Sequence, residues 1–189
     1  MAKIRTFISI DLPEEIKKDI KDLQDRLKTH GGHIGWVRPE AIHLTLKFLG
    51  AIDEKEITGI EAVVKKAVIG LDPFYLRISG LGVFPNLKRP KVIWVGVNEE
   101  GNGLIRIQSR IEDEMERIGY SKENRKFNPH LTIGRVRDIY GLKQIIDGIE
   151  AEKGIDLNGF HVTGVSFIKS ELRSEGAIYT RLFETTFKL

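Results

Sequence analysis

The sequence contains no cysteine, and this absence excludes several kinds of chemistry. A chain without cysteine cannot form a disulfide, use a thiolate as a nucleophile or bind zinc through sulfur ligands. The sequence also lacks an apolar run long enough to span a membrane, and its first residues lack the apolar segment of a secretion signal. We therefore expect a cytoplasmic protein that makes no membrane contact.

A strong charge of one sign is missing as well. The 30 Lys and Arg residues nearly balance the 27 Asp and Glu residues, which leaves a net charge of +3. So small an excess disfavours a protein that wraps long duplex nucleic acid. It is compatible with binding a single phosphate or the end of a strand.

No linker rich in Pro, Gly or Ser divides the 189 residues. We predict a single domain over residues 1–189 that has two lobes and a cleft between them. The apolar periodicity predicts strands at residues 3–10, 42–50, 74–78, 92–97, 129–136, 160–168 and 177–187, with a turn or bulge at 80–85. It predicts a helix that begins at Asp11, which offers an N-cap side chain, a second that begins at Asp53, and two more at 104–118 and 142–149. The expected fold class is α+β, with an antiparallel-type sheet in each lobe and helices on the outside.

Two of the predicted strands carry the same short motif. His43 and Thr45 stand two positions apart in the first, and His130 and Thr132 stand two positions apart in the second. Residues at i and i+2 of a strand share a face, so each histidine and its threonine point the same way while the apolar neighbours point into a core. A titratable pair on each of two related strands predicts a site built between the strands.

The repetition extends beyond the motif. Phe7 precedes His43 by 43 − 7 = 36 residues, and Trp94 precedes His130 by 130 − 94 = 36 residues. Such self-similarity indicates a repeated unit, here two copies at roughly residues 3–85 and 91–170, with C-terminal strands at 177–187 that complete the sheets. The other three histidines (His30, His33 and His161) lack this pattern, and we interpret them as structural.

Two histidines and two threonines are suited to acid–base catalysis at a phosphodiester. Imidazole titrates near ~6.5, so one ring can give a proton to the leaving oxygen while the other takes one from the nucleophile. The hydroxyls of Thr45 and Thr132 can donate to anionic oxygens, and Arg135 or Lys47 can supply positive charge. A catalytic metal is not expected, because neither motif brings a third histidine or a carboxylate at ligand spacing. The sequence also lacks a complete dinucleotide fingerprint, a phosphate-binding loop and a Gly-x-Ser-x-Gly elbow.

Four segments together resemble one family over nearly the whole chain. They are Arg5-Thr-Phe-Ile-Ser-Ile, His43-Leu-Thr-Leu-Lys-Phe-Leu-Gly, Gly82-Val-Phe-Pro and Pro129-His-Leu-Thr-Ile-Gly-Arg. The sequence is similar to the two-histidine (2H) phosphoesterases and, within them, to the RNA 2′,3′-cyclic phosphodiesterases, also called 2′-5′ RNA ligases.

The resemblance implies hydrolysis of a 2′,3′-cyclic phosphate at an RNA end to a 2′-phosphate, without a metal or any other cofactor. Some members join tRNA halves through a 2′-5′ bond in the reverse direction. The resemblance also implies that His43 is the proton donor and His130 the proton acceptor, whereas the residues alone leave the reverse assignment open. We expect a monomer whose partners are RNA ends.

Other residues have two interpretations. Phe48 and Phe84 can stack on the terminal base or pack in the core. The basic loop with Lys88, Arg89 and Lys91 can steer RNA or be a solvated surface. Two alternative functions also remain: hydrolysis of a small cyclic phosphate, such as one derived from ADP-ribose, and binding of RNA ends without turnover.

Overall fold

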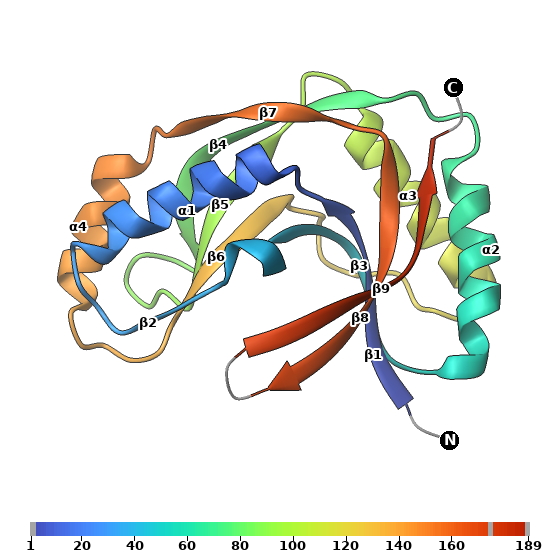
Figure 1. The fold of residues 1–189 in the computed structure, drawn as a ribbon, viewed down its shortest axis with the longest axis horizontal. Coiled ribbons are helices and arrows are strands. Elements are labelled where there is room, and N and C mark those ends of the chain that lie inside the picture. Colours follow the sequence, from blue (N-terminus) through green and yellow to red (C-terminus); the bar gives the residue numbers. More distant parts are fainter. Residues whose placement is uncertain (1–2, 174–175, 188–189) are drawn as a thin grey trace.

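The computed structural model describes residues 3–173 and 176–187, which form two antiparallel sheets with a pair of helices on each (Figure 1). Residues 1–2, 174–175 and 188–189, which the expected single domain includes, lie outside the described residues. The two sheets, their helices and the repeated arrangement confirm the predicted α+β class. No helix among the described residues combines the length and apolar character needed to cross a membrane.

Sheet A has the strand order β3-β1-β8-β9, and sheet B has the order β2-β6-β5-β4-β7. The strands of sheet A are β1 (Lys3–Asp11), β3 (His43–Asp53), β8 (Gly164–Arg173) and β9 (Gly176–Thr186). Those of sheet B are β2 (Ile34–Trp36), β4 (Phe74–Phe84), β5 (Val92–Asn98), β6 (His130–Val136) and β7 (Asp156–Val162). Helices α2 (Ile57–Val68) and α3 (Gly103–Arg117) pack on sheet A, and α1 (Glu14–Lys28) and α4 (Leu142–Glu152) lie on sheet B.

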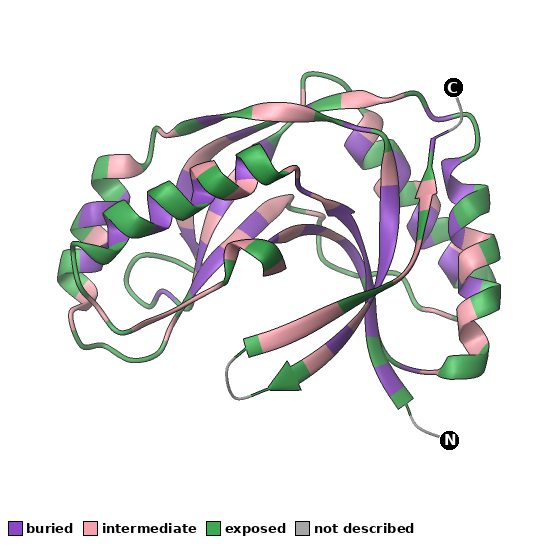
Figure 2. Cartoon of the chain, in the orientation of Figure 1, coloured by how far each residue is buried: buried purple, intermediate pink, exposed green. Residues whose placement is uncertain are grey.

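The helices follow the predicted apolar stripes. In α1 the buried apolar residues are Ile16, Ile20, Leu23 and Leu27, as the i, i+4, i+7, i+11 pattern predicted. Buried side chains from both sheets and all four helices join one hydrophobic cluster, and Figure 2 marks buried residues on each helix between exposed ones. This packing gives the strands that carry the motifs a rigid support.

The two predicted helix starts have different outcomes. A helical segment begins after Asp53, as predicted, and the structure adds that its side chain accepts from the backbone N–H of Lys55 in a capping box that opens the 3₁₀ turn Glu54–Glu56 before α2. The Asp11 cap was wrong, because Pro13 occupies the N-cap of α1 and makes no side-chain cap. The carboxylate of Asp11 instead accepts hydrogen bonds from other strands of sheet A.

Two strand boundaries also differ from expectation. The predicted strand 160–168 is two strands, because β7 ends at Val162 in sheet B and β8 begins at Gly164 in sheet A. The strand predicted at 74–78 continues as β4 to Phe84, and the turn or bulge predicted at 80–85 is present as a bulge in the pairing between Ile78 and Leu81.

The two sequence repeats do not coincide with the two sheets. In each sheet the motif strand pairs with the first strand of its own repeat, as β3 pairs with β1 and β6 with β5. The third strand comes from the other half of the chain, because β8 joins sheet A and β4 joins sheet B. The helices cross over too: α1 packs on sheet B and α3 on sheet A. Each lobe is therefore assembled from both repeats.

The strand register corrects the sequence alignment of the repeats. Ser9 pairs with Thr45, and Trp94 pairs with Thr132, so Ser9 is the structural counterpart of Trp94. Phe7, which has the same 36-residue spacing, pairs with Phe48 instead. The equal spacing of Phe7 and Trp94 from their histidines does not reflect equivalent positions.

Candidate active site

The two motif strands meet where the sheets join. Strand β3 is the edge of sheet A, and it contacts β6 of sheet B. Strand β2 pairs only with residues 134–136 of β6, so it leaves the His130–Thr132 portion uncovered on that side. Because β3 contacts β6, the two motif strands lie next to each other, and a site shared by the two His-x-Thr motifs stays a prediction.

Both histidines are held in the same way. The Nδ1 of His43 lies 2.9 Å from the carbonyl oxygen of Ala41, and the Nδ1 of His130 lies 2.7 Å from that of Asn128. A carbonyl oxygen can only accept, so Nδ1–H is the donor in both rings. Within residues 3–173 and 176–187 neither Nε2 atom forms a hydrogen bond, so each can in principle exchange a proton with a ligand.

Aromatic side chains fix the two rings further. The ring of Phe7 stacks on His43 with centroids 4.4 Å apart, and Tyr179 presents its edge to His43 at 5.1 Å. Phe84 presents its edge to His130 at 5.0 Å and also packs on Trp94. Tyr179 is a site residue that sequence reasoning missed, because nothing in the β9 sequence links it to the motif strands.

The residues opposite the two histidines differ. Asp11 pairs with His43 across β1 and β3, and Gly96 pairs with His130 across β5 and β6. A Cβ atom at Gly96 would lie 2.5 Å from the carbonyl oxygen of Ser79, so no side chain fits there. Burial lowers the pKa of His43, while its hydrogen bond to Ala41 and the negative charge of Asp11 act in the opposite direction.

Asp11 is held in place by two donors. Its Oδ2 atom accepts from Ser166 Oγ and from Arg181 Nη2, each at 2.7 Å. Arg181 also binds Glu184. The sequence offered no sign that Asp11 belongs to the site, because its position before a helix suggested a cap.

A bulge in each motif strand decides which later side chains reach the site. In β3 the pairing shifts after Thr45, and Leu46 is the extra residue. Lys47 then pairs with Ile8 and turns to the side of the sheet that α3 covers, whereas Phe48 pairs with Phe7 and returns to the side of His43. Phe48 is 63% exposed there.

Lys47 is therefore not at the site, contrary to expectation. Strict alternation along the strand would place it beside His43 and Thr45, but the bulge reverses its direction. Its ammonium group is buried and forms an ion pair of 2.5 Å with Glu112 of α3. We remove Lys47 from the set of substrate-binding residues.

The equivalent bulge in β6 brings Arg135 to the site. Ile133 is the extra residue, after which Arg135 pairs with Val92 on the same side as Thr132. The positive charge of Arg135 also acts on Tyr179 of sheet A. Burial raises the pKa of the Tyr179 hydroxyl, and the charges of Arg135 and Arg5 oppose that rise. Arg135 stands five residues after His130, as Phe48 stands five residues after His43.

A pocket of about 350 Å³ opens beside His43. Its apolar lining includes Phe7 and Ile168, and its polar lining includes Tyr179, Asp11 and Arg181. A second pocket of about 370 Å³, next to Arg26 and Glu152, contains neither motif. The pocket beside His43 is the one that can hold part of a ligand bound at the motifs.

The remaining candidates lie away from the two histidines or on their periphery. Lys88, Arg89 and Lys91 are exposed in the loop that follows Phe84. His33 pairs with Asp138, and His161 contacts the ring of Tyr75, so each has a partner outside the motifs. Among the described residues, no three His, Asp or Glu side chains converge as a metal site would need.

Comparisons with known proteins agree on one family. The family model described as LigT-like phosphoesterase matches the chain twice, at residues 10–94 and 95–179. A Methanothermobacter thermautotrophicus protein named RNA 2′,3′-cyclic phosphodiesterase is 35% identical over 178 residues, covering 94% of this chain and 96% of the relative. A protein of that name from Thermotoga maritima is also 35% identical, over 98% of this chain and 96% of its own.

Solved structures show the same fold. A Thermus thermophilus protein superposes with a TM-score of 0.79 at 26% identity, over 97% of both chains. E. coli LigT in complex with 3′-AMP superposes with a TM-score of 0.77 at 25% identity, over 99% of both chains.

Proposed function

Since the chain belongs to the LigT-like phosphoesterase family, we propose that it is an RNA 2′,3′-cyclic phosphodiesterase. The enzyme opens a 2′,3′-cyclic phosphate at an RNA end and leaves a 2′-phosphate and a free 3′-hydroxyl. The observation that carries this proposal is the pair of matching imidazoles, each with Nδ1–H bound to a backbone carbonyl and Nε2 free. The names of the full-length relatives supply the substrate class.

In the proposed reaction, the two Nε2 atoms move one proton each. Neutral His130 takes a proton from a water molecule as its oxygen bonds to phosphorus. The bond between phosphorus and O3′ breaks, and protonated His43 gives its Nε2 proton to O3′. The hydroxyls of Thr45 and Thr132 donate to the non-bridging phosphate oxygens, and Arg135 balances their charge.

The assignment of His43 as the donor is supported by the strand register. Asp11 lies opposite His43 and stabilises a charged imidazolium, whereas Gly96 offers no charge to His130. Burial alone favours the neutral form of His43. The anionic phosphate of a bound substrate acts together with Asp11 to overcome that effect.

The terminal nucleotide has two surfaces to contact. The pocket beside His43 offers the aromatic walls of Phe7 and Tyr179 together with polar groups at its rim, which suits a ribose and a base. Phe48, exposed on the same side of sheet A, can stack on a base, and Phe84 provides a second aromatic surface beside His130. Lys88, Arg89 and Lys91 supply positive charge for the RNA that follows.

The same chemistry allows ligation. If the 5′-hydroxyl of a second RNA end replaces water, its oxygen bonds to phosphorus as the bond to O3′ breaks, and a 2′-5′ linkage forms. We propose tRNA halves as substrates for this direction. We also propose that the protein is a monomer and that it is located in the cytoplasm, as the sequence predicts.

Hydrolysis of small cyclic phosphates is the second candidate function. The observation that favours it is the solved relative described with 3′-AMP, a single nucleotide. The two candidates separate when a cyclic-phosphate oligonucleotide and the matching mononucleotide are compared by kcat/KM. We expect the oligonucleotide to be preferred, because a longer RNA can also contact Lys88, Arg89 and Lys91 in the exposed loop after Phe84.

The decisive experiment incubates the purified protein with a 2′,3′-cyclic-phosphate oligonucleotide in EDTA and identifies the product by ³¹P NMR. We expect a 2′-phosphate. An unchanged cyclic phosphate or a 3′-phosphate product contradicts the proposed function. Loss of activity in EDTA that zinc or manganese restores would overturn the metal-independent mechanism while leaving the substrate class intact.

A further inference from the structure

Lys47 has no role in binding the phosphate, yet it is one of the most closely held polar side chains in the protein. It lies on β3, four residues after His43, and is 5% exposed. Its ammonium Nζ donates to Glu112 Oε2 at 2.5 Å and to the carbonyl oxygen of Ser121 at 2.8 Å. A buried lysine keeps its charge only when such partners surround it.

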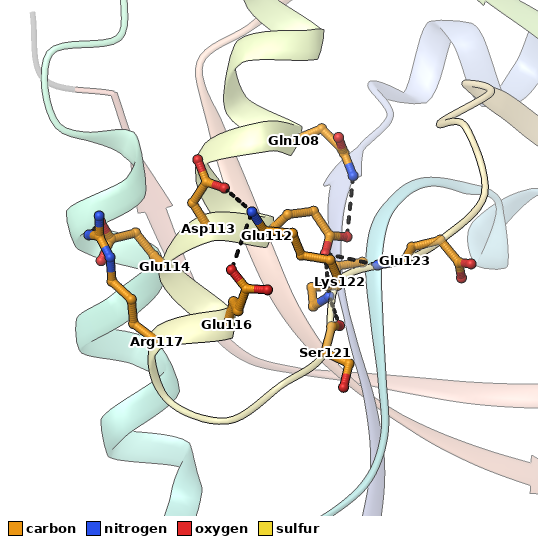
Figure 3. Close-up of polar contacts among 10 residues, drawn as sticks. Gln108, Glu112, Asp113, Glu114, Glu116, Arg117, Ser121, Lys122 and Glu123 are labelled. Atoms are coloured by element: carbon orange, nitrogen blue, oxygen red, sulfur yellow. Dashed lines mark hydrogen bonds and ion pairs between the residues drawn. The ribbon is translucent and has the colours of Figure 1, made fainter.

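Glu112 of α3 is equally well bound. Besides Lys47, it accepts from the side-chain amide of Gln108 at 3.3 Å and from the backbone N–H of Glu123 at 3.2 Å. Figure 3 shows Glu112 between these donors, with Ser121 and Glu123 in the segment that leaves the helix. The ion pair therefore ties the start of this segment to both α3 and β3.

This segment leads directly to the second catalytic strand. Residues 121–129 connect α3 to β6, and the carbonyl oxygen of Asn128 holds the Nδ1–H of His130. Lys47 thus links the strand that carries His43 to the loop that orients His130. The link runs behind the sheet, on the side away from the substrate.

We propose that Lys47, with Glu112, is a positioning residue that fixes loop 121–129 and so sets the orientation of His130 relative to His43. The inference rests on the proposed catalytic role of the two histidines. The fold of the motif does not itself require a lysine, because the equivalent residue of the second motif, four residues after His130, is Gly134. A pair of apolar side chains would fill the space without the two contacts to the loop.

The test replaces both charges at once, as Lys47→Met with Glu112→Leu. Removing both partners leaves no buried unpaired charge, so we expect a melting temperature close to that of the wild type. Because Ser121 and Glu123 lose their partners, we expect kcat to fall about tenfold to a hundredfold, with a smaller change in KM. Wild-type kcat in the folded double variant overturns the proposal.

Lys122 supplies the matched control. It begins the same loop but forms exposed ion pairs with Asp113 and Glu116 of α3, which Figure 3 also shows. Exposed pairs contribute little to structure, so we expect Lys122→Met to keep the wild-type kcat. A fall in kcat equal to that of the double variant would mean that any anchor of the loop suffices, and it would refute a specific role for Lys47.

Two further measurements keep the test decisive. If the double variant does not fold, Lys47→Met alone removes the donor to the Ser121 carbonyl and leaves Glu112 able to take up a proton, and we expect the same fall in kcat; a wild-type kcat would refute the proposal. NMR of ¹⁵N-labelled histidine reports on the rings without turnover. We expect the Nδ1–H signal of His130 to shift or exchange faster while that of His43 stays. This readout tests the positioning even if the enzyme proves inactive on cyclic phosphates, and an unchanged His130 signal contradicts it.

Discussion

Asp11 lies directly opposite His43 on the neighbouring strand, whereas Gly96 holds the same place opposite His130. The two halves of the site are therefore matched in geometry and unequal in charge. The carboxylate of Asp11 favours the protonated form of His43, and a proton donor must begin the reaction in that form. In the proposed mechanism this difference in charge favours His43 as the proton donor and His130 as the acceptor.

The first prediction concerns the dependence of the rate on pH. A donor and an acceptor together give a bell, and the basic limb falls as the donor loses its proton. Asp11→Asn removes the charge that raises the pKa of His43, so the pKa falls and the basic limb should move to lower pH. The measurement is kcat/KM from pH 5 to 9.

Glu184→Gln is the control for this variant, because it removes a negative charge that also binds Arg181 but is not among the groups that shift the pKa of His43. We expect its profile to match the wild type. If Asp11→Asn moves the acidic limb instead, the roles of His43 and His130 are reversed. The limbs belong to the coupled pair, so each assignment depends on the variant rather than on the shape of the bell.

The second prediction is that His43→Ala and His130→Ala each reduce kcat by roughly a hundredfold to ten-thousandfold, because each removes one proton carrier. Both rings are partly buried at the seam between the sheets, so circular dichroism should accompany the kinetics. His161→Ala, which changes a histidine of β7 outside the motifs, should retain activity. A variant at either motif histidine that turns over normally would exclude that residue from the mechanism.

The third prediction concerns Arg135, which a bulge turns to the side of Thr132. Arg135→Ala should lower kcat/KM by about 10²- to 10³-fold, because it removes the positive charge proposed to balance the phosphate oxygens in the transition state. Arg137, exposed just beyond the end of β6, is the matched control and should tolerate the same change. Equal effects of the two variants would show that the contribution is general surface charge.

The fourth prediction concerns Phe48, whose ring is 63% exposed. Phe48→Ala should weaken binding of a cyclic-phosphate oligonucleotide by about 1–3 kcal/mol, the contribution of stacking on one base. Stability should change little. Ile69, 62% exposed just after α2 on the other side of sheet A, is a control of equal exposure. Unchanged affinity in Phe48→Ala would remove base stacking from the proposal.

The elements that local sequence determines were predicted well. The apolar stripe of α1 and the helix start at Asp53 depend on residues within a few positions of each other, and both are present. The histidines and threonines were found because a repeated motif carries information that one copy does not. Each histidine lies on the same face of its strand as its threonine, and this follows from the alternation of side chains along a strand.

Features that depend on distant strands were missed. The direction of Lys47 depends on a bulge that is visible only in the pairing with β1, so alternation placed it wrongly. Tyr179 reaches His43 from a strand more than a hundred residues away, and Asp11 binds Ser166 and Arg181 from β8 and β9. No pattern around these residues shows which strands will be neighbours.

The exchange of the third strand between the two sheets bears on how such a chain can arise. A polypeptide of one repeat would form a sheet in which one edge of its first strand is unpaired, and its last strand would have no partner in that sheet. Two identical copies would pair these edges by exchanging their last strands, as β4 and β8 are exchanged between the two sheets here. Joining the copies in one chain would keep the strand exchange and allow the two sequences to diverge. Asp11 and Gly96 would then record that divergence, in which a symmetric pair of histidines acquired unequal neighbours.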